Sequence, residues 1–116
     1  MPKKIKIPNY SDYRGSLGVI EKIINFKIKR VYFLHSLKKN ISRGNHSHKK
    51  NIQFFICLNG KAEIKFKKKK YLLSKPNYGI LVKPDDWHEI IPKIDSTIIL
   101  VLASHTYNKK DYIYEK

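Results

Sequence analysis

Short runs rich in β-branched and aromatic residues recur along the chain, whereas helical periodicity is almost absent. Such runs, separated by turn signals, are typical of an all-β sandwich or barrel. Six to eight short strands without crossover helices predict a small jelly roll or a related barrel. We predict strands at 30–37, 51–58, 62–67, 70–74, 79–83, 87–91 and 96–104, with a weaker one at 16–22.

Turn residues mark the boundaries between these runs. Asn59-Gly60 predicts a two-residue hairpin between 51–58 and 62–67, because both residues tolerate positive φ. Segments 74–79 and 83–86 combine Pro with Asn or Asp and predict turns. The lysine run 67–70 predicts a solvated hairpin turn whose charge also blocks edge pairing. The C-terminal segment NKKDYIYEK is expected to dock as a short helix or strand, or to fray.

The length of 116 residues predicts one domain, residues 1–116, with a single core. The one cysteine, Cys57, lies in an apolar run, so we expect a buried thiol and a reducing compartment. The N-terminus lacks a signal-peptide pattern, and no stretch approaches the roughly 20 apolar residues of a membrane span. We therefore expect a cytoplasmic protein without a membrane partner.

The formal net charge is +16, from 25 Lys and Arg against 9 Asp and Glu. This charge favours a polyanionic partner, such as nucleic acid, anionic lipid or a phosphorylated small molecule, without choosing among them. Only three of the basic residues are Arg, the type that binds phosphate in bidentate fashion. A surface dominated by Lys is also explained by a compositional habit of the source genome.

His46 and His48 are separated by one residue, so on a strand their side chains leave the same face. Imidazole has an unperturbed pKa of about 6.5, which suits proton transfer near neutral pH. The pair is therefore compatible with acid/base catalysis or with metal binding. The remaining alternative is an exposed polar loop over residues 45–50.

The surroundings of this pair resemble the two sequence boxes of the cupin jelly-roll superfamily. The matching residues are Gly44, His46, His48, Gln53 and Gly60 in the first box, and Gly79, Pro84 and His88 in the second. In metal-binding cupins, the residues at 46, 48, 53 and 88 are the ligands. A neutral amide at Gln53 supplies no negative charge, which argues against a required metal, although three histidines remain a possible zinc set.

A second set of motifs follows one order along the chain, from residue 12 to residue 113. The motifs are Asp12-x-Arg14-Gly15-x-Leu17, Phe26-x-Ile28-x-Arg30-Val31-Tyr32, Arg43-Gly44-x-His46-x-His48-Lys49-x(3)-Gln53, Pro84-x-x-Trp87-His88, and Val101-Leu102-Ala103-Ser104 with Asp111-Tyr112-Ile113. Together they resemble the 3,4-ketoisomerases that act on nucleotide-linked 4-keto-6-deoxy sugars, the WxcM-like or FdtA/QdtA-type enzymes. Ser47 departs from the usual Ala, and the chain is somewhat shorter than is typical.

The resemblance implies an all-β fold, a small cupin jelly-roll barrel, in a homodimer with exchanged N-terminal strands. It implies an isomerase that converts a dTDP-linked 4-keto-6-deoxyhexose to its 3-keto isomer, in deoxyamino-sugar and surface-polysaccharide synthesis. The reaction moves protons through an enediol and requires no cofactor. Positioned proton transfer of this kind contributes roughly 10²–10⁴-fold in rate.

The resemblance also implies catalytic roles. We assign His46 as the base at carbon 3 and His48 as the proton shuttle for carbon 4. Tyr32 is expected to hydrogen-bond the sugar oxygens or the enediolate, or else to be an amphipathic aromatic at the sheet surface. Arg43 is expected to hold the diphosphate, or else to be a surface cation.

Further residues are expected to bind the substrate. Arg14 is either a charge that flanks a turn or, if the N-terminal strand reaches the pocket, a contact to the sugar or the phosphate. Because the resemblance implies that this strand is exchanged, Tyr13 and Arg14 would then serve the partner's active site. Lys49 is assigned a phosphate or structural contact, and Gln53 is assigned to fixing an imidazole tautomer. His88 is expected to face the pocket from the opposite sheet.

Two alternatives remain beside the isomerase. One is a basic, non-catalytic β-barrel that binds nucleic acid, and the other is a metal-dependent cupin enzyme. The aromatic residues alternate as expected for sheet faces and show no RNA-stacking motif. We therefore expect a dTDP-sugar partner and no nucleic-acid partner.

Overall fold

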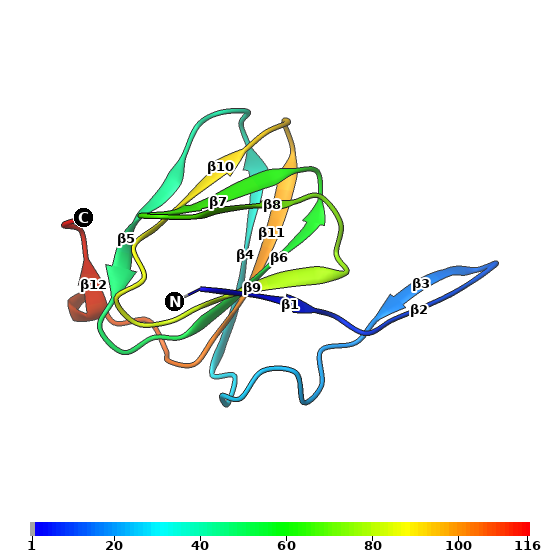
Figure 1. The fold of residues 1–116 in the computed structure, drawn as a ribbon, viewed down its shortest axis with the longest axis horizontal. Helices are drawn as coiled ribbons and strands as arrows, with labels where there is room; N and C mark the ends of the chain where they lie inside the picture. The colour runs from blue at the N-terminus through cyan, green and yellow to red at the C-terminus, as the bar shows by residue number, and fades with distance from the viewer. Residues whose placement is uncertain (1) are drawn as a thin grey trace.

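The computed structural model describes residues 2–116 and consists of two five-stranded antiparallel sheets that pack face to face (Figure 1). The first sheet has the order β1 (Lys3–Lys6), β9 (Tyr78–Val82), β6 (Gln53–Asn59), β11 (Thr97–Ala103) and β4 (Arg30–Leu37). The second has the order β12 (Tyr112–Ile113), β5 (Arg43–His48), β10 (His88–Pro92), β7 (Ala62–Phe66) and β8 (Lys70–Leu73). A separate hairpin pairs β2 (Asn9–Asp12) with β3 (Gly15–Gly18), and a short 3-10 helix, η1, spans Lys109–Asp111.

The predicted all-β jelly roll is confirmed. Each of the seven main predicted strands is present, with ends that differ by at most two residues. The weaker prediction at 16–22 corresponds to the shorter β3, Gly15–Gly18. The strands β1, β2, β5 and β12 were not among those predicted, because they are polar or short and become strands by pairing with a partner strand.

The prediction that Asn59-Gly60 closes a hairpin is wrong. β6 pairs with β9 and β11, whereas β7 pairs with β8 and β10, so the turn passes from one sheet to the other. Gly60 has a φ of +91°, as the sequence suggests, but a Cβ there would lie 2.9 Å from the Cα of Thr97. The turn therefore packs against the start of β11. From this turn the chain crosses from the first sheet to the second.

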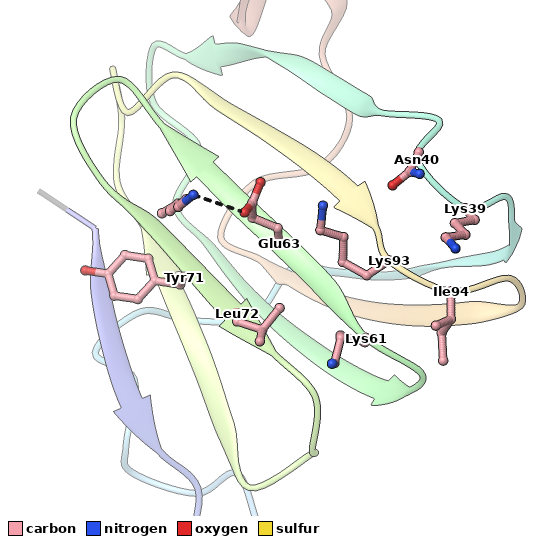
Figure 2. Close-up of a pocket in the computed structure, with 9 residues that line it drawn as sticks. Lys39, Asn40, Lys61, Glu63, Tyr71, Leu72, Lys93 and Ile94 are labelled. Atoms are coloured by element: carbon pink, nitrogen blue, oxygen red, sulfur yellow. Dashed lines mark ion pairs between the residues drawn. The ribbon is translucent and has the colours of Figure 1, made fainter.

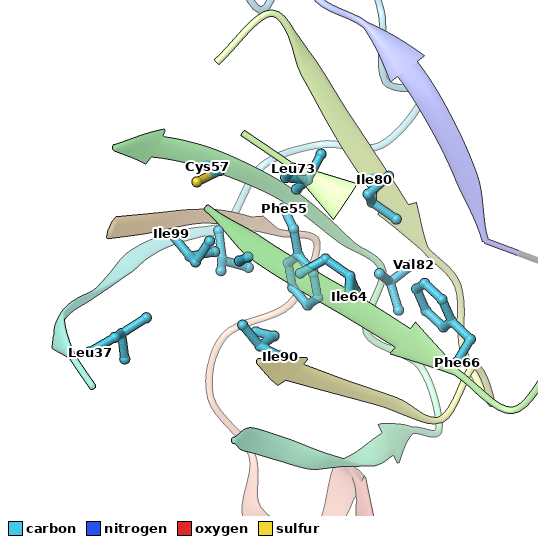
Figure 3. Close-up of a cluster of buried hydrophobic side chains, with 12 residues drawn as sticks. Leu37, Phe55, Cys57, Ile64, Phe66, Leu73, Ile80, Val82, Ile90 and Ile99 are labelled. Atoms are coloured by element: carbon cyan, nitrogen blue, oxygen red, sulfur yellow. The ribbon is translucent and has the colours of Figure 1, made fainter. Parts of the chain in front are cut away.

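The main core fills the space between the two sheets (Figure 3). It forms because alternate residues of each strand point inward and bury their apolar side chains. Its members include Phe55 and Cys57 from β6, Ile64 from β7, Ile90 from β10 and Ile99 from β11. The expectation of a buried free thiol at Cys57 is confirmed.

A second apolar cluster lies on the outer face of the first sheet. Phe54 and Ile56 of β6 point to this face and pack with Leu102 of β11. The segment between β3 and β4 covers them with Ile20, Ile23, Ile24 and Phe26. Burial on both faces explains why β6 is a continuous apolar run instead of an alternating one.

The β2–β3 hairpin and the C-terminal segment lie at opposite ends of the molecule (Figure 1). The β2–β3 hairpin extends away from the barrel, and the C-terminal segment docks beside β5 through η1 and β12. Of the alternatives predicted for the C-terminus, docking is therefore confirmed. Among residues 2–116, no helix has the length and apolar character that crossing a membrane would require.

Candidate active site

Three histidines meet at one end of the barrel, on neighbouring strands of the second sheet. His46 and His48 belong to β5, and His88 of β10 is the direct cross-strand partner of His46. The ring centroids are 4.8 Å apart for His46 and His48, and 4.9 Å apart for His46 and His88. The expected proximity of His46 and His48 is confirmed. The expectation that His88 comes from the opposite sheet is wrong, because β10 pairs with β5.

A cavity of about 380 Å³ opens beside these histidines and is lined from both sheets. His46 and His88 line it from the second sheet, and Tyr32 and Phe55 line it from the first. His48 is packed against His46 and only 2% exposed, so it lies deeper than the ring that lines the cavity. The remaining lining residues are Arg30, Leu34, Arg43, Gly44, Ile90, Tyr112 and Tyr114.

Burial keeps the three imidazoles neutral. It lowers the pKa of His46 below its ordinary value, more than the Gly44 carbonyl raises it. It also lowers the pKa of His48, with a further contribution from His46, and these effects outweigh the Asp111 carboxylate. The pKa of His88 falls to about 3, mainly through burial. Neutral rings are the form required of a general base.

Asp111 fixes the orientation of His48 from the C-terminal segment. His48 Nδ1 lies 3.0 Å from Asp111 Oδ2. The backbone N–H of Lys50 donates to Oδ1 at 2.8 Å, and that of Asn51 donates to Oδ2 at 3.3 Å. Burial raises the pKa of Asp111, but the hydrogen bonds from Lys50, His48 and Asn51 outweigh it and hold the pKa below its usual value. The carboxylate is therefore ionised beside His48.

Tyr32 of β4 and Gln53 of β6 form a hydrogen-bonded pair. Their strands lie on either side of β11 in the first sheet. Gln53 is 1% exposed, and its Nε2 donates to the Tyr32 hydroxyl at 2.7 Å. Burial raises the pKa of Tyr32 to about 12, although the nearby Arg30 opposes this. The Arg30 guanidinium stacks over the Tyr32 ring, 4.4 Å from its centroid. The Tyr32 hydroxyl is therefore protonated at the wall of the cavity.

The other predicted residues divide into two groups. Arg43 lines the cavity, as expected for a residue that binds phosphate. The Lys49 side chain is exposed, while its backbone N–H donates to the Asp111 carbonyl at 2.9 Å. Tyr13 and Arg14 lie on the β2–β3 hairpin, at the opposite end of the molecule from β5 (Figure 1). They are not brought to the cavity of their own chain.

Four residues of the site received no role from the sequence, namely Arg30, Asp111, Tyr112 and Tyr114. Strand alternation gave a signal for Arg30, because it lies two residues before Tyr32 and shares its face. Asp111 and Tyr112 belong to a matched motif, but they lie more than 60 positions from His48 in the sequence. Strand patterns do not predict a contact over such a separation. The Tyr112 ring lies 4.8 Å from His46 and 4.6 Å from His48.

A larger groove, about 670 Å³, lies on the outer surface of the second sheet (Figure 2). Lys39, Lys61, Lys70 and Lys93 line it together with Glu63, which pairs with Lys70 at 3.8 Å. Lysines on an open sheet face are usually solvated cations. The cluster of three imidazoles lies at the smaller cavity, and none of them lines this groove.

Residues 2–116 match the family described as "FdtA: WxcM-like, C-terminal". The chain belongs to this family. The match covers all the residues that the structure describes, and so includes both sheets and the histidine cavity. The resemblance predicted from the sequence motifs is thereby confirmed.

Proteins similar to this chain include some that are described as sugar-nucleotide isomerases. A TDP-4-oxo-6-deoxy-alpha-D-glucose-3,4-oxoisomerase from Aneurinibacillus thermoaerophilus is 38% identical over 117 residues, covering 96% of this chain and 84% of that protein. A 3,4-ketoisomerase structure from Helicobacter canadensis has 34% identity and a TM-score of 0.93, covering 98% of this chain and 90% of its own.

A third relative carries a bound sugar nucleotide. It is a histidine-to-asparagine variant of the sugar 3,4-ketoisomerase QdtA from Thermoanaerobacterium thermosaccharolyticum, in complex with TDP-4-keto-6-deoxyglucose. It has 38% identity and a TM-score of 0.87, and the match covers 98% of this chain and 87% of that structure.

Proposed function

We propose that this protein is an isomerase that converts a dTDP-linked 4-keto-6-deoxyhexose to its 3-keto isomer. The observation that supports this most directly is a neutral His46 ring at the wall of a cavity that Tyr32 and two arginines also line. The relatives with 34–38% identity are described as 3,4-ketoisomerases or oxoisomerases. Neither the nucleic-acid-binding barrel nor the metal-dependent enzyme is favoured by these relatives.

In the proposed mechanism, His46 removes the proton from carbon 3 of the sugar. The carbonyl at carbon 4 acidifies this proton, and its loss gives an enediolate. His46 is suited to the step because it lines the cavity and burial keeps it neutral. The carbon-4 oxygen then takes up a proton, the carbon-3 hydroxyl gives up its proton, and carbon 4 is protonated, which leaves the carbonyl at carbon 3 and a hydroxyl at carbon 4.

His48 is proposed to act as a proton shuttle for the step at carbon 4. Its ring lies edge-on to His46, at an interplanar angle of 88° and a centroid distance of 4.8 Å. The Asp111 carboxylate holds its Nδ1–H and stabilises positive charge that forms on the pair. His48 is buried and does not line the cavity, so it does not contact the substrate directly. We propose that it passes the proton to the substrate through a side chain that lines the cavity.

Tyr32 is proposed to stabilise the enediolate oxygen. Gln53 donates to the Tyr32 oxygen, so the Tyr32 hydroxyl proton is free to point into the cavity. A fixed donor aimed at developing negative charge is an effective form of catalysis. Arg43 and Arg30 line the same cavity and are proposed to hold the diphosphate, since guanidinium groups bind phosphate oxygens in bidentate fashion.

The function is tested by incubating the protein with dTDP-4-keto-6-deoxyglucose in deuterated water. We expect a 3-keto product that carries deuterium at carbon 4, detected by NMR and mass spectrometry; deuterium at carbon 3 can appear only in recovered 4-keto compound. Absence of both the product and the isotope would contradict the proposal. Retention of the 4-keto compound with exchange at carbon 3 would locate the defect in the second proton transfer.

We also propose a homodimer in which the β2–β3 hairpin serves the partner's cavity. The hairpin pairs only with itself among the described strands, and Tyr13 at its tip is 98% exposed. Val31 and Phe33 on the outer face of β4 are 58% and 61% exposed, which leaves apolar area for a second copy to cover. Strand β1 pairs with β9 of its own chain, so the segment exchanged in this proposal is the hairpin.

The dimer is tested by mixing two inactive variants, Arg14→Ala and His46→Asn. If the hairpin serves the partner, a mixed dimer has one intact site, and the mixture recovers part of the activity. If Arg14 acts within its own chain, no site in the mixture is intact and activity stays absent. Sedimentation velocity on each variant checks that both still associate.

The cellular setting is proposed on chemical grounds. Cys57 is a free, buried thiol, which is suited to the reducing cytoplasm. A 3-keto sugar nucleotide is a suitable substrate for an aminotransferase, so we propose a place in deoxyamino-sugar and surface-polysaccharide synthesis. Identification of the 3-keto product as a substrate for such an aminotransferase tests this placement.

A further inference from the structure

The loop between β5 and β6 holds Asp111 through consecutive backbone N–H groups. The N–H of Lys49 donates to the Asp111 carbonyl oxygen at 2.9 Å. The next two N–H groups, of Lys50 and Asn51, donate to the Asp111 carboxylate at 2.8 and 3.3 Å. Successive N–H groups that converge on one anion form a binding site for it. The position of the carboxylate, and with it the orientation of His48, therefore depends on the conformation of this loop.

The same loop is tied to the end of β11 by the side chain of Asn51. Its Oδ1 atom accepts a hydrogen bond from the backbone N–H of His105 at 3.2 Å and one from the Ser104 hydroxyl at 3.4 Å. The Ser104 Oγ atom accepts from the N–H of Ile52 at 2.8 Å and also lies 2.8 Å from His105 Nδ1. The N–H of Ser104 donates to the Ile52 carbonyl at 2.9 Å. These hydrogen bonds fix residues 51 and 52 against the end of β11.

Asn51 and Ser104 are buried polar residues, with 5% and 7% of their surface exposed. Burial of a polar side chain is unfavourable unless its hydrogen bonds are made, so a network of this kind specifies one local conformation. Neither residue is among those that line the histidine cavity. Any effect of either residue on the proposed reaction must therefore pass through Asp111.

We propose that Asn51 is a positioning residue of the isomerase, which sets the tautomer and orientation of His48 by way of the loop and Asp111. Removal of its side chain releases the loop from β11, so the N–H groups no longer hold the carboxylate in one place. His48 Nδ1 then loses a fixed acceptor, and the ring populates its other tautomer. The Ser104 hydroxyl supports the same arrangement from β11.

The effect on turnover rests on the proposed isomerase function, whereas the effect on the His48 tautomer does not. A displacement of about 1 Å in a catalytic constellation can reduce turnover by roughly 10²-fold. The sugar nucleotide is held by other residues, so its binding should change much less than the chemical step. A change in kcat with little change in KM is therefore expected.

The positioning is tested by NMR of the imidazole nitrogens in isotope-labelled wild type, Asn51→Ala and Ser104→Ala, with the His48 signals assigned from their loss in His48→Asn. In the wild type we expect a protonated Nδ1 and an unprotonated Nε2. In the two variants, the two signals should move toward each other because both tautomers are populated. A wild-type His48 pattern in the folded variants would overturn the proposal, and so would a wild-type ring protonated on Nε2.

Thr97→Val is the matched control, because Thr97 is a fully buried hydroxyl residue at the opposite end of β11. Its hydroxyl donates to the Ile94 carbonyl at 2.9 Å and lies 3.3 Å from the N–H of Lys61. The control loses comparable buried hydrogen bonds, so it should be destabilised in a similar way while His48 keeps its signals. An equal change of the His48 signals in Thr97→Val would show that general loosening is sufficient, and would overturn the proposal.

A double-mutant cycle with Asp111→Ala tests the route of the effect. Asn51→Ala is expected to lower kcat by roughly tenfold to 10²-fold in the wild type and to have no further effect in Asp111→Ala. Additive losses would overturn action through Asp111. Circular dichroism monitors folding, and Ser104→Ala replaces Asn51→Ala in the cycle if the latter does not fold.

The two readouts separate this inference from the proposed function. A protein whose His48 tautomer responds to Asn51→Ala, but which never converts the sugar nucleotide in any form, would remove the isomerase and leave the positioning of His48 standing. An active wild type whose His48 tautomer and kcat are both unchanged in folded Asn51→Ala would remove the positioning role and leave the isomerase standing.

Discussion

His48 and Asp111 lie 63 positions apart in the sequence, yet His48 Nδ1 and Asp111 Oδ2 are 3.0 Å apart in the folded chain. The contact exists because β12 pairs with β5 and places Tyr112 opposite His48. It ties the C-terminal segment to the buried histidine. It also fixes the tautomer of His48, with the proton on Nδ1 and the lone pair on Nε2.

Asp111→Asn is expected to reduce kcat at least about tenfold, because an amide N–H at the Oδ2 position would favour the other His48 tautomer. The acidic limb of the pH–rate profile should also move, which a purely structural defect would not produce. Steady-state kinetics across pH provide the measurement.

Asp95→Asn is the control for this variant, because Asp95 accepts a backbone hydrogen bond from Lys39 and lies in the turn before β11. Asp95→Asn should leave the pH profile unchanged. A wild-type profile in Asp111→Asn would contradict the positioning role.

His46→Asn is expected to lower turnover by roughly 10²–10⁴-fold, the usual contribution of a positioned acid or base. Asparagine is of similar size and keeps the fold while removing the titratable nitrogen. The loss should appear in deuterium incorporation as well as in product formation. His35→Asn, at an exposed histidine outside the cavity, should retain activity, and an equal effect of the two substitutions would remove the assignment of His46.

The pH dependence of kcat/KM follows from the state of His46. Its neutral form is the base, and burial lowers its pKa, so the neutral form persists below the ordinary value of about 6.5. Activity should therefore be flat around neutral pH and decline on acidification with a midpoint below about 6.5. An acidic limb with a midpoint above that value would contradict this assignment.

Tyr32→Phe is expected to reduce kcat by roughly 10²–10³-fold while KM changes little, because the lost donor acts mainly on the enediolate. The substitution keeps the ring, and with it the stacking of Arg30 at 4.4 Å. Rapid-quench measurement of single turnovers locates the effect in the chemical step. Reduced affinity with unchanged turnover would instead make Tyr32 a binding residue.

Gly79→Ala is expected to destabilise the fold by about 1–3 kcal/mol through overpacking. A Cβ at position 79 would overlap the ring of Phe54, which is buried and cannot easily move. Thermal unfolding followed by circular dichroism measures the change. Gly18→Ala is the control, since its Cβ would meet only Ile7 Cγ2 at 3.9 Å. Equal stability of the two variants would show that the sheet accommodates the Gly79 substitution.

Local sequence determined the features that lie within a single strand. Alternation and β propensity located the seven main strands, and the His-x-His spacing placed two imidazoles on one face of β5. The ordered motifs predicted the family correctly, because they match it at many positions from residue 12 to residue 113. The single domain remains a prediction, and so do the catalytic and substrate-binding roles of all the assigned site residues.

Tertiary structure decided which strands pair and which side chains the pairing brings together. Asn59-Gly60 has the local signature of a hairpin but sends the chain to the other sheet, because pairing is decided by which neighbours bury β6 and β7. In the same way, the pairing of β10 with β5 set His88 beside His46, and the docking of β12 brought Asp111 to His48. Such contacts depend on long-range pairing and shared burial, whereas spacing and propensity describe only residues that are neighbours along the chain.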